Sequence, residues 1–397
     1  MSRSPSVKTS GLLFIMILSA LMAFTSLSTD IYLPAMPVMA KELHGNAELT
    51  ITGFLIGFCL AQLIWGPISD HLGRRPPLII GMVLFIIGSA GCALSTDITH
   101  IVFWRVFQAL GACTGPMLAR AMIRDLFSRT RAAQMLSTLT IVMAVAPIVG
   151  PLLGGQMIKF TSWHAIFWLL TAIGVFMLLS LYWLPETLPI ERRVSASLSG
   201  AFRTYCRLLS HVNFMKFTLC LTFYYVAVYA FIAGSPFVYI THFHVEPQHY
   251  GWLFAVNIVG VMGLSAVNRH LVQRYPMETL LKRAILIAAI AALILAVATK
   301  LSVGGIALIV IAIFILFSMN GIIAATATAA ALDTAPDAAG SASALIGSLQ
   351  YGSGIISSLL LSIFSDGTPW TMGWIITLFT LASAAMAFTT RISKQSY

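Results

Sequence analysis

The first candidate for chemistry is an acidic residue in an apolar stretch. In the segment FTSLSTDIYLPAMP (24–37), Asp30 is the first charged residue of an apolar run that begins at Gly11. A carboxylate within a membrane span costs about 2.5–3.5 kcal/mol on insertion scales, so such a residue usually faces a protein interior or belongs to a proton relay. We therefore predict a functional Asp30. The alternative is that the first helix ends early and leaves Asp30 in the outer interface.

A second charge, Arg105, lies inside the fourth apolar stretch. At about 1.5 Å per residue, Asp30 and Arg105 each lie roughly 9–15 Å from the outer end of their spans. We expect them to form a pair that couples transport to protons. Burial and a neighbouring guanidinium act on the pKa of Asp30 in opposite directions, which suits a group that binds and releases a proton. The alternative for Arg105 is that it snorkels to the outer interface.

These charges require membrane spans to position them. Of 397 residues, 58% are hydrophobic and 9% are charged, against about 25% charged in soluble domains. Stretches long enough to cross about 30 Å of hydrocarbon recur along the chain. The sequence predicts an all-α membrane protein with twelve spans, near 11–38, 48–69, 77–96, 99–122, 132–157, 164–184, 214–240, 247–268, 279–299, 303–328, 338–364 and 369–390.

The charge distribution indicates the orientation. The net charge is +10, and most lysines and arginines fall on one side of the twelve spans, which by the positive-inside rule is the cytoplasm. Both termini are therefore expected to be cytoplasmic. A basic cytoplasmic face suits anionic lipids rather than nucleic acid. The five cysteines show no metal or disulfide spacing and are expected to be packing residues.

The longest polar interval, 185–213, divides the spans six and six. We predict an N-terminal six-helix bundle over 1–184, a cytoplasmic linker over 185–213 and a C-terminal six-helix bundle over 214–397. Within the linker, residues 200–210 place apolar side chains at helical spacing with arginines on another face, which indicates an interfacial amphipathic helix.

Several motifs resemble those of one transporter family. GPISDHLGRRP (66–76) resembles the G-x-x-x-D-R-x-G-R-R loop of the major facilitator superfamily, with His71 in place of an arginine. APIVGPLLGG (146–155) resembles the G-P-x-x-G-G motif of its drug:proton antiporter branch. RVFQALGACTG (105–115) is similar to the R-x-x-Q-G motif, with Ala109 in place of the glycine. STDIYLPAMP and LPETLP resemble the Bcr/CflA multidrug exporters in particular.

The resemblance implies a major facilitator fold of two six-helix bundles, alternating access and proton-coupled export of small molecules. Bicyclomycin, sulfonamides and chloramphenicol-like drugs are among the substrates of relatives. It also implies a monomer in the bacterial inner membrane, with substrates, protons and lipids as partners. The sequence contains no phosphate-binding glycine loop, nucleophile motif or metal-spaced cluster, so we expect neither an enzyme nor a cofactor or metal.

Two groups of motif residues are expected to act in conformational change. The first is a cytoplasmic latch, with Asp70 near a helix N-terminus of the other half and Arg74 or Arg75 near a carboxylate; the alternative is a solvated turn. The second is a small-residue face on the fifth span that slides against the second half; the alternative is close packing within the first half. These residues are Gly66, Asp70, Gly73, Arg74, Arg75, Gly150, Pro151, Gly154 and Gly155.

Pro34 is expected to open the first helix. Proline lacks the amide hydrogen that would bond the carbonyl of Asp30, four residues earlier. A bent outer segment could then gate a substrate cavity, although prolines near a helix end are often only structural.

A multidrug cavity should be largely apolar, with aromatic residues, methionine and few polar groups. Candidates, each of which could equally be a packing residue, are Tyr32, Gln108, Met143, Tyr225, Tyr229, Asn257, Asn320 and Gln350. The function favoured is a proton-coupled antiporter that exports small amphipathic drugs or metabolites. The rivals are a proton-coupled importer of a metabolite such as a nucleoside and, more distantly, a membrane sensor that transports nothing.

Overall fold

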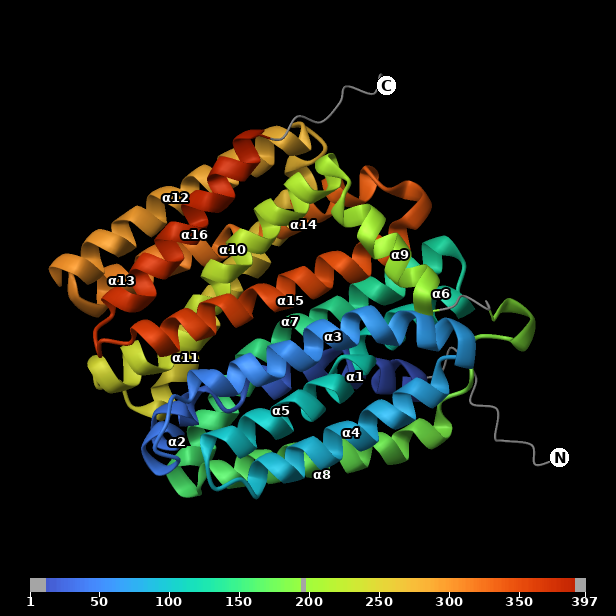
Figure 1. Cartoon of the computed structure of the whole chain (residues 1–397), viewed down its shortest axis with the longest axis horizontal. Helices are drawn as coiled ribbons and strands as arrows, with labels where there is room; N and C mark the ends of the chain where they lie inside the picture. The colour runs from blue at the N-terminus through green and yellow to red at the C-terminus, as the bar shows by residue number, and fades with distance from the viewer. Residues whose placement is uncertain (1–11, 194–197, 390–397) are drawn as a thin grey trace. The chain divides into compact units, whose positions relative to one another are not determined.

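The computed structural model describes residues 12–193 and 198–389, and within these ranges the regular structure is entirely helical (Figure 1). Twelve helical segments are long and apolar enough to cross a membrane, which confirms the number predicted from hydropathy. They are Leu13–Glu42, Glu48–Leu72, Arg75–Ala93, Ile98–Leu126, Val142–Phe160, Trp163–Trp183, Val212–His242, Pro247–Leu271, Met277–Leu301, Gly305–Asp333, Pro336–Phe364 and Trp370–Thr389.

The chain divides into two compact units, Met1–Ala201 and Phe202–Tyr397. The division falls within the interval 185–213 that the sequence marked as a linker. The first unit and the boundary contain α1 (Leu12–Asp30), η1 (Leu33–Ala35), α2 (Met36–Glu42), α3 (Glu48–Leu72), α4 (Arg75–Ala93), α5 (Ile98–Ala112), α6 (Thr114–Leu126), α7 (Arg129–Phe160), α8 (Trp163–Ser180), η2 (Leu181–Trp183), η3 (Ile190–Arg192) and α9 (Leu198–Leu209).

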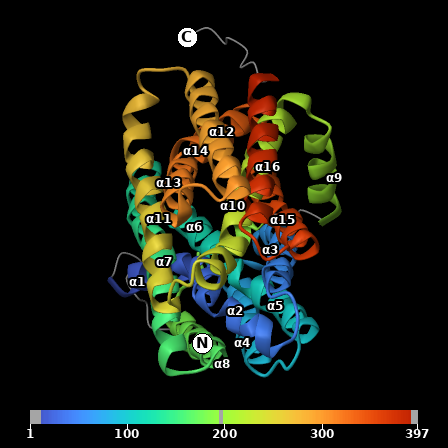
Figure 2. The ribbon, with the colours of Figure 1, turned by 90° about the vertical axis from the view of Figure 1, so that its left-hand side faces the viewer.

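In the second unit, the long helix α10 is surrounded by its neighbours. α10 packs along α15 and α16, an arrangement that can be followed in Figure 2. A π-helical segment, η4, directly follows Pro236 and continues the same span. The elements are α10 (Val212–Pro236), η4 (Phe237–His242), α11 (Pro247–Leu271), α12 (Met277–Leu301), α13 (Gly305–Ser318), α14 (Asn320–Asp333), η5 (Pro336–Ala338), α15 (Ala339–Phe364) and α16 (Trp370–Thr389).

The first span is interrupted where the prolines predict it. α1 ends at Asp30, the 3₁₀ helix η1 contains Pro34, and α2 completes the span. Because proline has no amide hydrogen, the carbonyl of Asp30 loses its helical donor at this point. The amide of Ala35 instead donates to the carbonyl of Tyr32 at 2.8 Å, which starts the tighter 3₁₀ turn. The predicted opening of the helix at Asp30 is therefore confirmed.

The helix α5 is held close to its neighbours in the first unit. α4, α5 and α8 lie side by side, and α5 also packs on α3 (Figure 1). A side chain at Gly57 of α3 would overlap the carbonyl of Val106, so only glycine allows this approach. At its start, the carboxylate of Asp97 accepts a hydrogen bond from the amide of His100 at 2.9 Å and caps the helix. This packing fixes the height and rotation of Arg105.

Candidate functional site

Arg105 is completely buried in the first unit and is held by carbonyl oxygens. Its Nε donates to the carbonyl of Thr50 at 3.3 Å, and its Nη1 donates to the carbonyl of Ser28 at 3.1 Å. The same Nη1 donates to Oε1 of Gln108 at 2.5 Å. A buried charge is tolerated only when such partners replace water. The snorkelling alternative is wrong, because the side chain reaches no surface.

Aromatic rings complete the surroundings of the guanidinium. Its central carbon lies 4.4 Å from the ring centroids of Tyr32 and Phe54 and 6.0 Å from that of Phe167. Such faces attract cations, and the attraction grows when water is excluded. The hydroxyl groups of Tyr32 and Thr50 form a hydrogen bond of 3.1 Å that fixes the ring in place. The protein thus binds this charge mainly through dipoles and π faces.

Asp30 is the last residue of α1 and is 6% exposed. Its side chain is therefore enclosed by protein, and the helix does end there as the interface alternative expects. Among the described residues no ion pair joins Asp30 to Arg105, so the direct pair expected from their depths is not formed. Arg105 instead reaches the carbonyl of Ser28, two residues before Asp30. Depth estimates fix the height of a residue but not the direction of its side chain, which explains the error.

One donor of the site has no partner. Nη2 of Arg105 is buried and makes no hydrogen bond to any described residue. Its two neighbouring nitrogens are satisfied by carbonyls and by Gln108, whose amide in turn donates to the Ser89 hydroxyl at 2.8 Å. A buried polar group without a partner carries a penalty of about 1–3 kcal/mol, more when it is charged. The site therefore holds a free donor for a carboxylate or a ligand.

The break in the first span rests on the glycine face of α7. A side chain at Gly154 would overlap the carbonyl oxygen of Ile31, and one at Gly150 would lie 3.3 Å from Cβ of Asp30. Pro151 and Gly155 are buried in the same stretch. Gly150 and Gly154 thus contact the first span, as the alternative of close packing within the first half expects. These contacts do not support a sliding interface with the second half.

Gly154→Ala should lower the free energy of unfolding by about 1–3 kcal/mol, because the added methyl group must displace the backbone of Ile31. Unfolding of the purified protein in detergent measures this. Gly263→Ala in α11 is the matched control, since no atom lies within 4 Å of the added carbon. Equal stability of Gly154→Ala and Gly263→Ala would show that the glycine face does not support the helix break.

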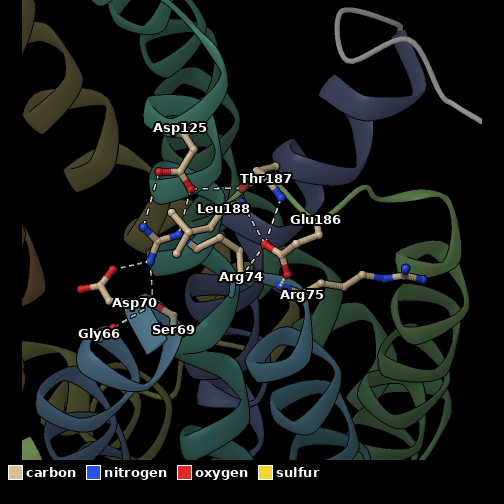
Figure 3. A network of polar contacts seen from close by, with 9 residues as sticks. All are labelled: Gly66, Ser69, Asp70, Arg74, Arg75, Asp125, Glu186, Thr187 and Leu188. Atoms are coloured by element: carbon tan, nitrogen blue, oxygen red, sulfur yellow. Dashed lines mark hydrogen bonds and ion pairs between the residues drawn. The ribbon is translucent and has the colours of Figure 1, made fainter. Parts of the chain in front are cut away.

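The turn after α3 forms a charge network (Figure 3). Gly73 has φ +97°, a conformation that side chains rarely adopt, and it brings Arg74 back toward the end of α3. Arg74 donates from Nη1 to Asp70 at 2.6 Å and to the Ser69 hydroxyl at 2.8 Å, and from Nε to Asp125 at 2.9 Å. Arg74 thus lies beside two carboxylates, Asp70 and Asp125 at the end of α6, while the latch function stays a prediction.

Glu186, from the LPETLP segment, caps the start of α4 in the same network. Its Oε1 accepts from the amides of Arg74, Thr187 and Leu188 at 2.8, 3.0 and 3.0 Å, and its Oε2 accepts from the amide of Arg75 at 3.0 Å. A carboxylate at a helix N-terminus also interacts favourably with the helix dipole. The Thr187 hydroxyl donates to Asp125 at 3.1 Å. The end of α8 is thereby connected to α4 and α6 (Figure 3).

Arg74 is 8% exposed, so the solvated-turn alternative does not hold for it. Burial lowers the pKa of the guanidinium, but hydrogen bonds to Asp125 and Asp70 outweigh this and leave the pKa above its usual value. Arg74 therefore stays charged at any physiological pH. The side chains of Asp70 and His71 face water. The proposed partner of Asp70 in the other half stays a prediction.

Of the remaining two latch residues, Arg75 forms a side-chain hydrogen bond and Gly66 has open space beside it. Arg75 donates from Nη2 to the carbonyl of Tyr182 at 3.5 Å. A side chain at Gly66 would meet no atom within 4 Å. Packing therefore gives no reason for a glycine at that position.

Glu186→Gln should lower the free energy of unfolding by about 1–2 kcal/mol, because an amide has a single acceptor oxygen for four backbone donors. Unfolding in detergent is again the measurement. Glu191→Gln removes an equal charge from an exposed position five residues later and should leave stability unchanged. Equal loss in both variants would assign the effect to net charge rather than to the cap.

Three acidic residues that were not among the sequence candidates have notable surroundings in the first unit. Asp125 and Glu186 form the network above, and Glu48, at the start of α3, is 7% exposed. The LPETLP motif marked Glu186 without giving it a role. Asp125 and Glu48 lie at the ends of predicted spans, where a charged residue is ordinary, so nothing in the sequence distinguishes them.

The substrate candidates fall in both units. Tyr32 and Gln108 are fully buried in the Arg105 network, and Met143 is half-buried in α7. In the second unit, the rings of Tyr225, Tyr229 and Tyr351 follow one another with centroids 6.2 Å apart. The remaining candidates, Asn257, Asn320 and the half-buried Gln350, belong to α11, α14 and α15; Oδ1 of each asparagine is buried without a hydrogen bond to any described residue.

Comparisons with known proteins agree with this architecture. The family model of the Major Facilitator Superfamily matches residues 17–358, and the chain belongs to that superfamily of transporters. The fold is similar to that of the xylose transporter XylE from E. coli in a partially occluded inward open conformation. The TM-score is 0.70 at 15% identity, over 97% of this chain and 99% of that one.

Sequence relatives define the branch more narrowly. The chain is 36% identical to the uncharacterized MFS-type transporter YdgK of Bacillus subtilis, over 91% of each. It is 30% identical to the bicyclomycin resistance protein homolog of Haemophilus influenzae, over 94% of this chain and 96% of that one. The predicted Bcr/CflA drug:proton antiporter subfamily is confirmed. The protein is a multi-pass inner-membrane transporter and not an enzyme.

Proposed function

We propose that this transporter exports small amphipathic compounds in exchange for protons and that Asp30 is the coupling carboxylate. The observation that carries the proposal is a buried carboxylate at a break in the first span, close in the chain to a carbonyl that a buried arginine binds. Arg105 Nη1 donates to the carbonyl of Ser28, two residues before Asp30, and its Nη2 has no partner among the described residues. Ionisable residues inside a membrane span mark proton or substrate pathways. The names of the relatives, bicyclomycin resistance and multidrug resistance, support drugs as the exported class.

The exchange follows from competition for one charged site. When Asp30 is ionised, Arg105 Nη2 offers a donor that a substrate or the carboxylate itself can use. When a proton binds, the negative charge is lost and the attraction between the two side chains falls. The substrate binds while Asp30 is ionised, and it leaves when a proton binds Asp30. This alternation exchanges substrate for protons, which is antiport. Because the helix is open at Asp30, the outer segment of the span can change its angle without breaking a full helical ladder.

Two buried asparagines support the assignment of substrate contacts in the second unit. Oδ1 of Asn257 and of Asn320 accept no hydrogen bond from the described residues. Unpartnered buried acceptors are costly unless a ligand or water uses them. Tyr225 and Tyr229 offer flat apolar faces of the kind that suit aromatic compounds. We include Tyr32, Gln108, Met143 and Gln350 in the same proposal as weaker candidates.

The proposal also covers the orientation in the membrane, the oligomeric state and the energy source. Both termini lie in the cytoplasm, since most basic residues outside the spans fall on their side. The protein is proposed to act as a monomer. It uses the proton gradient without a cofactor, and its membrane-facing surfaces bind lipid.

Asp30→Asn should retain substrate binding but lose uphill transport and the pH dependence of binding, since the amide keeps the shape and cannot titrate. Transport is measured in everted vesicles energised by respiration, with bicyclomycin, chloramphenicol and a broad drug panel added. In wild-type vesicles a substrate should partly collapse the proton gradient. Asp30→Glu should keep partial function.

Asp366→Asn is the matched control. Asp366 lies in the exposed turn before α16, where Thr368 and Thr371 donate to its carboxylate, so the same chemical change occurs outside the spans. Asp366→Asn should exchange substrate for protons at the wild-type rate. Proton-coupled transport at the wild-type rate in Asp30→Asn would remove this carboxylate from the mechanism. Movement of substrate out of the everted vesicles together with protons would instead identify an importer.

A further inference from the structure

In the chain, α9 follows the sixth span and precedes the seventh. It is too short to cross the membrane. It has 12 residues, which at 1.5 Å per residue gives about 18 Å, against about 30 Å of hydrocarbon. In Figure 1 it runs across the direction of α10, which starts at Val212. Because α10 enters the bilayer, the last residues of α9 are within a few residues of the membrane surface.

The helix presents three distinct faces. Tyr205 and Leu208 are each 4% exposed and form the face that packs on the protein. Phe202, Cys206 and Leu209 form a second, apolar face at spacings of four and three residues, which places them in one stripe. Phe202 is 47% and Leu209 46% exposed. The ring of Phe202 contacts that of Tyr205 edge-on at 5.8 Å, so the stripe is anchored to the buried face.

The third face is basic and has no counter-charge among the described residues. Arg203 and Arg207 are exposed, lie one turn apart beside the apolar stripe, and form no ion pair with any residue the structure describes. The sequence contains no Asp or Glu between Glu191 and Glu246. A positive stripe next to an apolar stripe is the order of groups found at a bilayer surface, where phosphates lie above acyl chains.

We propose that α9 is a binding site for anionic phospholipid. Arg203 and Arg207 bind the headgroup phosphate, for which the planar guanidinium has the matching fork of donors. Phe202, Cys206 and Leu209 enter the boundary between headgroups and acyl chains. A soluble acidic protein would match the basic face but not the adjoining apolar stripe, which the bilayer covers without a further partner. The site is independent of which compound the transporter exports.

The test uses full-length protein in a neutral detergent, with an environment-sensitive fluorophore on Cys206 and Cys59→Ser to prevent labelling of the other partly exposed cysteine. Phosphatidylglycerol or phosphatidylcholine is titrated into the micelles. We expect a blue shift at a lower mole fraction of phosphatidylglycerol than of phosphatidylcholine. Each of Arg203→Gln and Arg207→Gln should raise the half-saturating fraction of phosphatidylglycerol about fivefold.

Arg269→Gln and Arg274→Gln are the charge-matched controls, because both residues are exposed around the end of α11. They should leave the titration unchanged. Phe202→Ser should reduce the size of the blue shift. Equal half-saturation by the two lipids, or equal effects of the α9 and control variants, would overturn the proposal. A shift produced by inorganic phosphate alone, or only by added acidic protein, would do so as well.

Discussion

The burial of Arg105 is the constraint on which the packing of α1, α3 and α5 depends. A guanidinium without water needs acceptors, and here they come from Gln108 and from the backbone of two neighbouring helices at Ser28 and Thr50. Those carbonyls must therefore stay at fixed positions relative to α5. Close packing at Gly57 keeps α3 near enough, and the aromatic faces of Tyr32 and Phe54 cover the charge. Only a compact bundle can hold a charge this way.

The open turn at Asp30 is the second consequence of the same arrangement. An unsatisfied backbone group is costly in a membrane unless it is buried in protein, and the glycine face of α7 provides the cover at Ile31. The polar network of Arg74, Asp125 and Glu186 connects the other ends of α3 and α4 to α6 and to the segment after α8. The unit thus combines a hydrogen-bonded network at one end with a broken helix near its other end, where Asp30 lies.

Much of this could be predicted because the membrane restricts the choices. Long apolar runs can only be helices, so the twelve spans followed from hydropathy, and Pro34 dictated the break at Asp30. The partners of individual side chains could not be predicted. Height along a span placed Asp30 and Arg105 in one layer but did not give their rotation, and small residues on α7 did not reveal that the first span covers them. Asp125 lacked any distinguishing signal, since an acid at a span end is common.

Proton release on substrate binding shows whether Asp30 exchanges a proton for substrate. Purified protein in weakly buffered detergent, near neutral pH with a pH-indicator dye, receives a compound that the transporter exports. Wild-type protein should release protons in proportion to the sites filled. Asp30→Asn should bind the compound and release none. Unchanged proton release from Asp30→Asn would show that another group exchanges the proton.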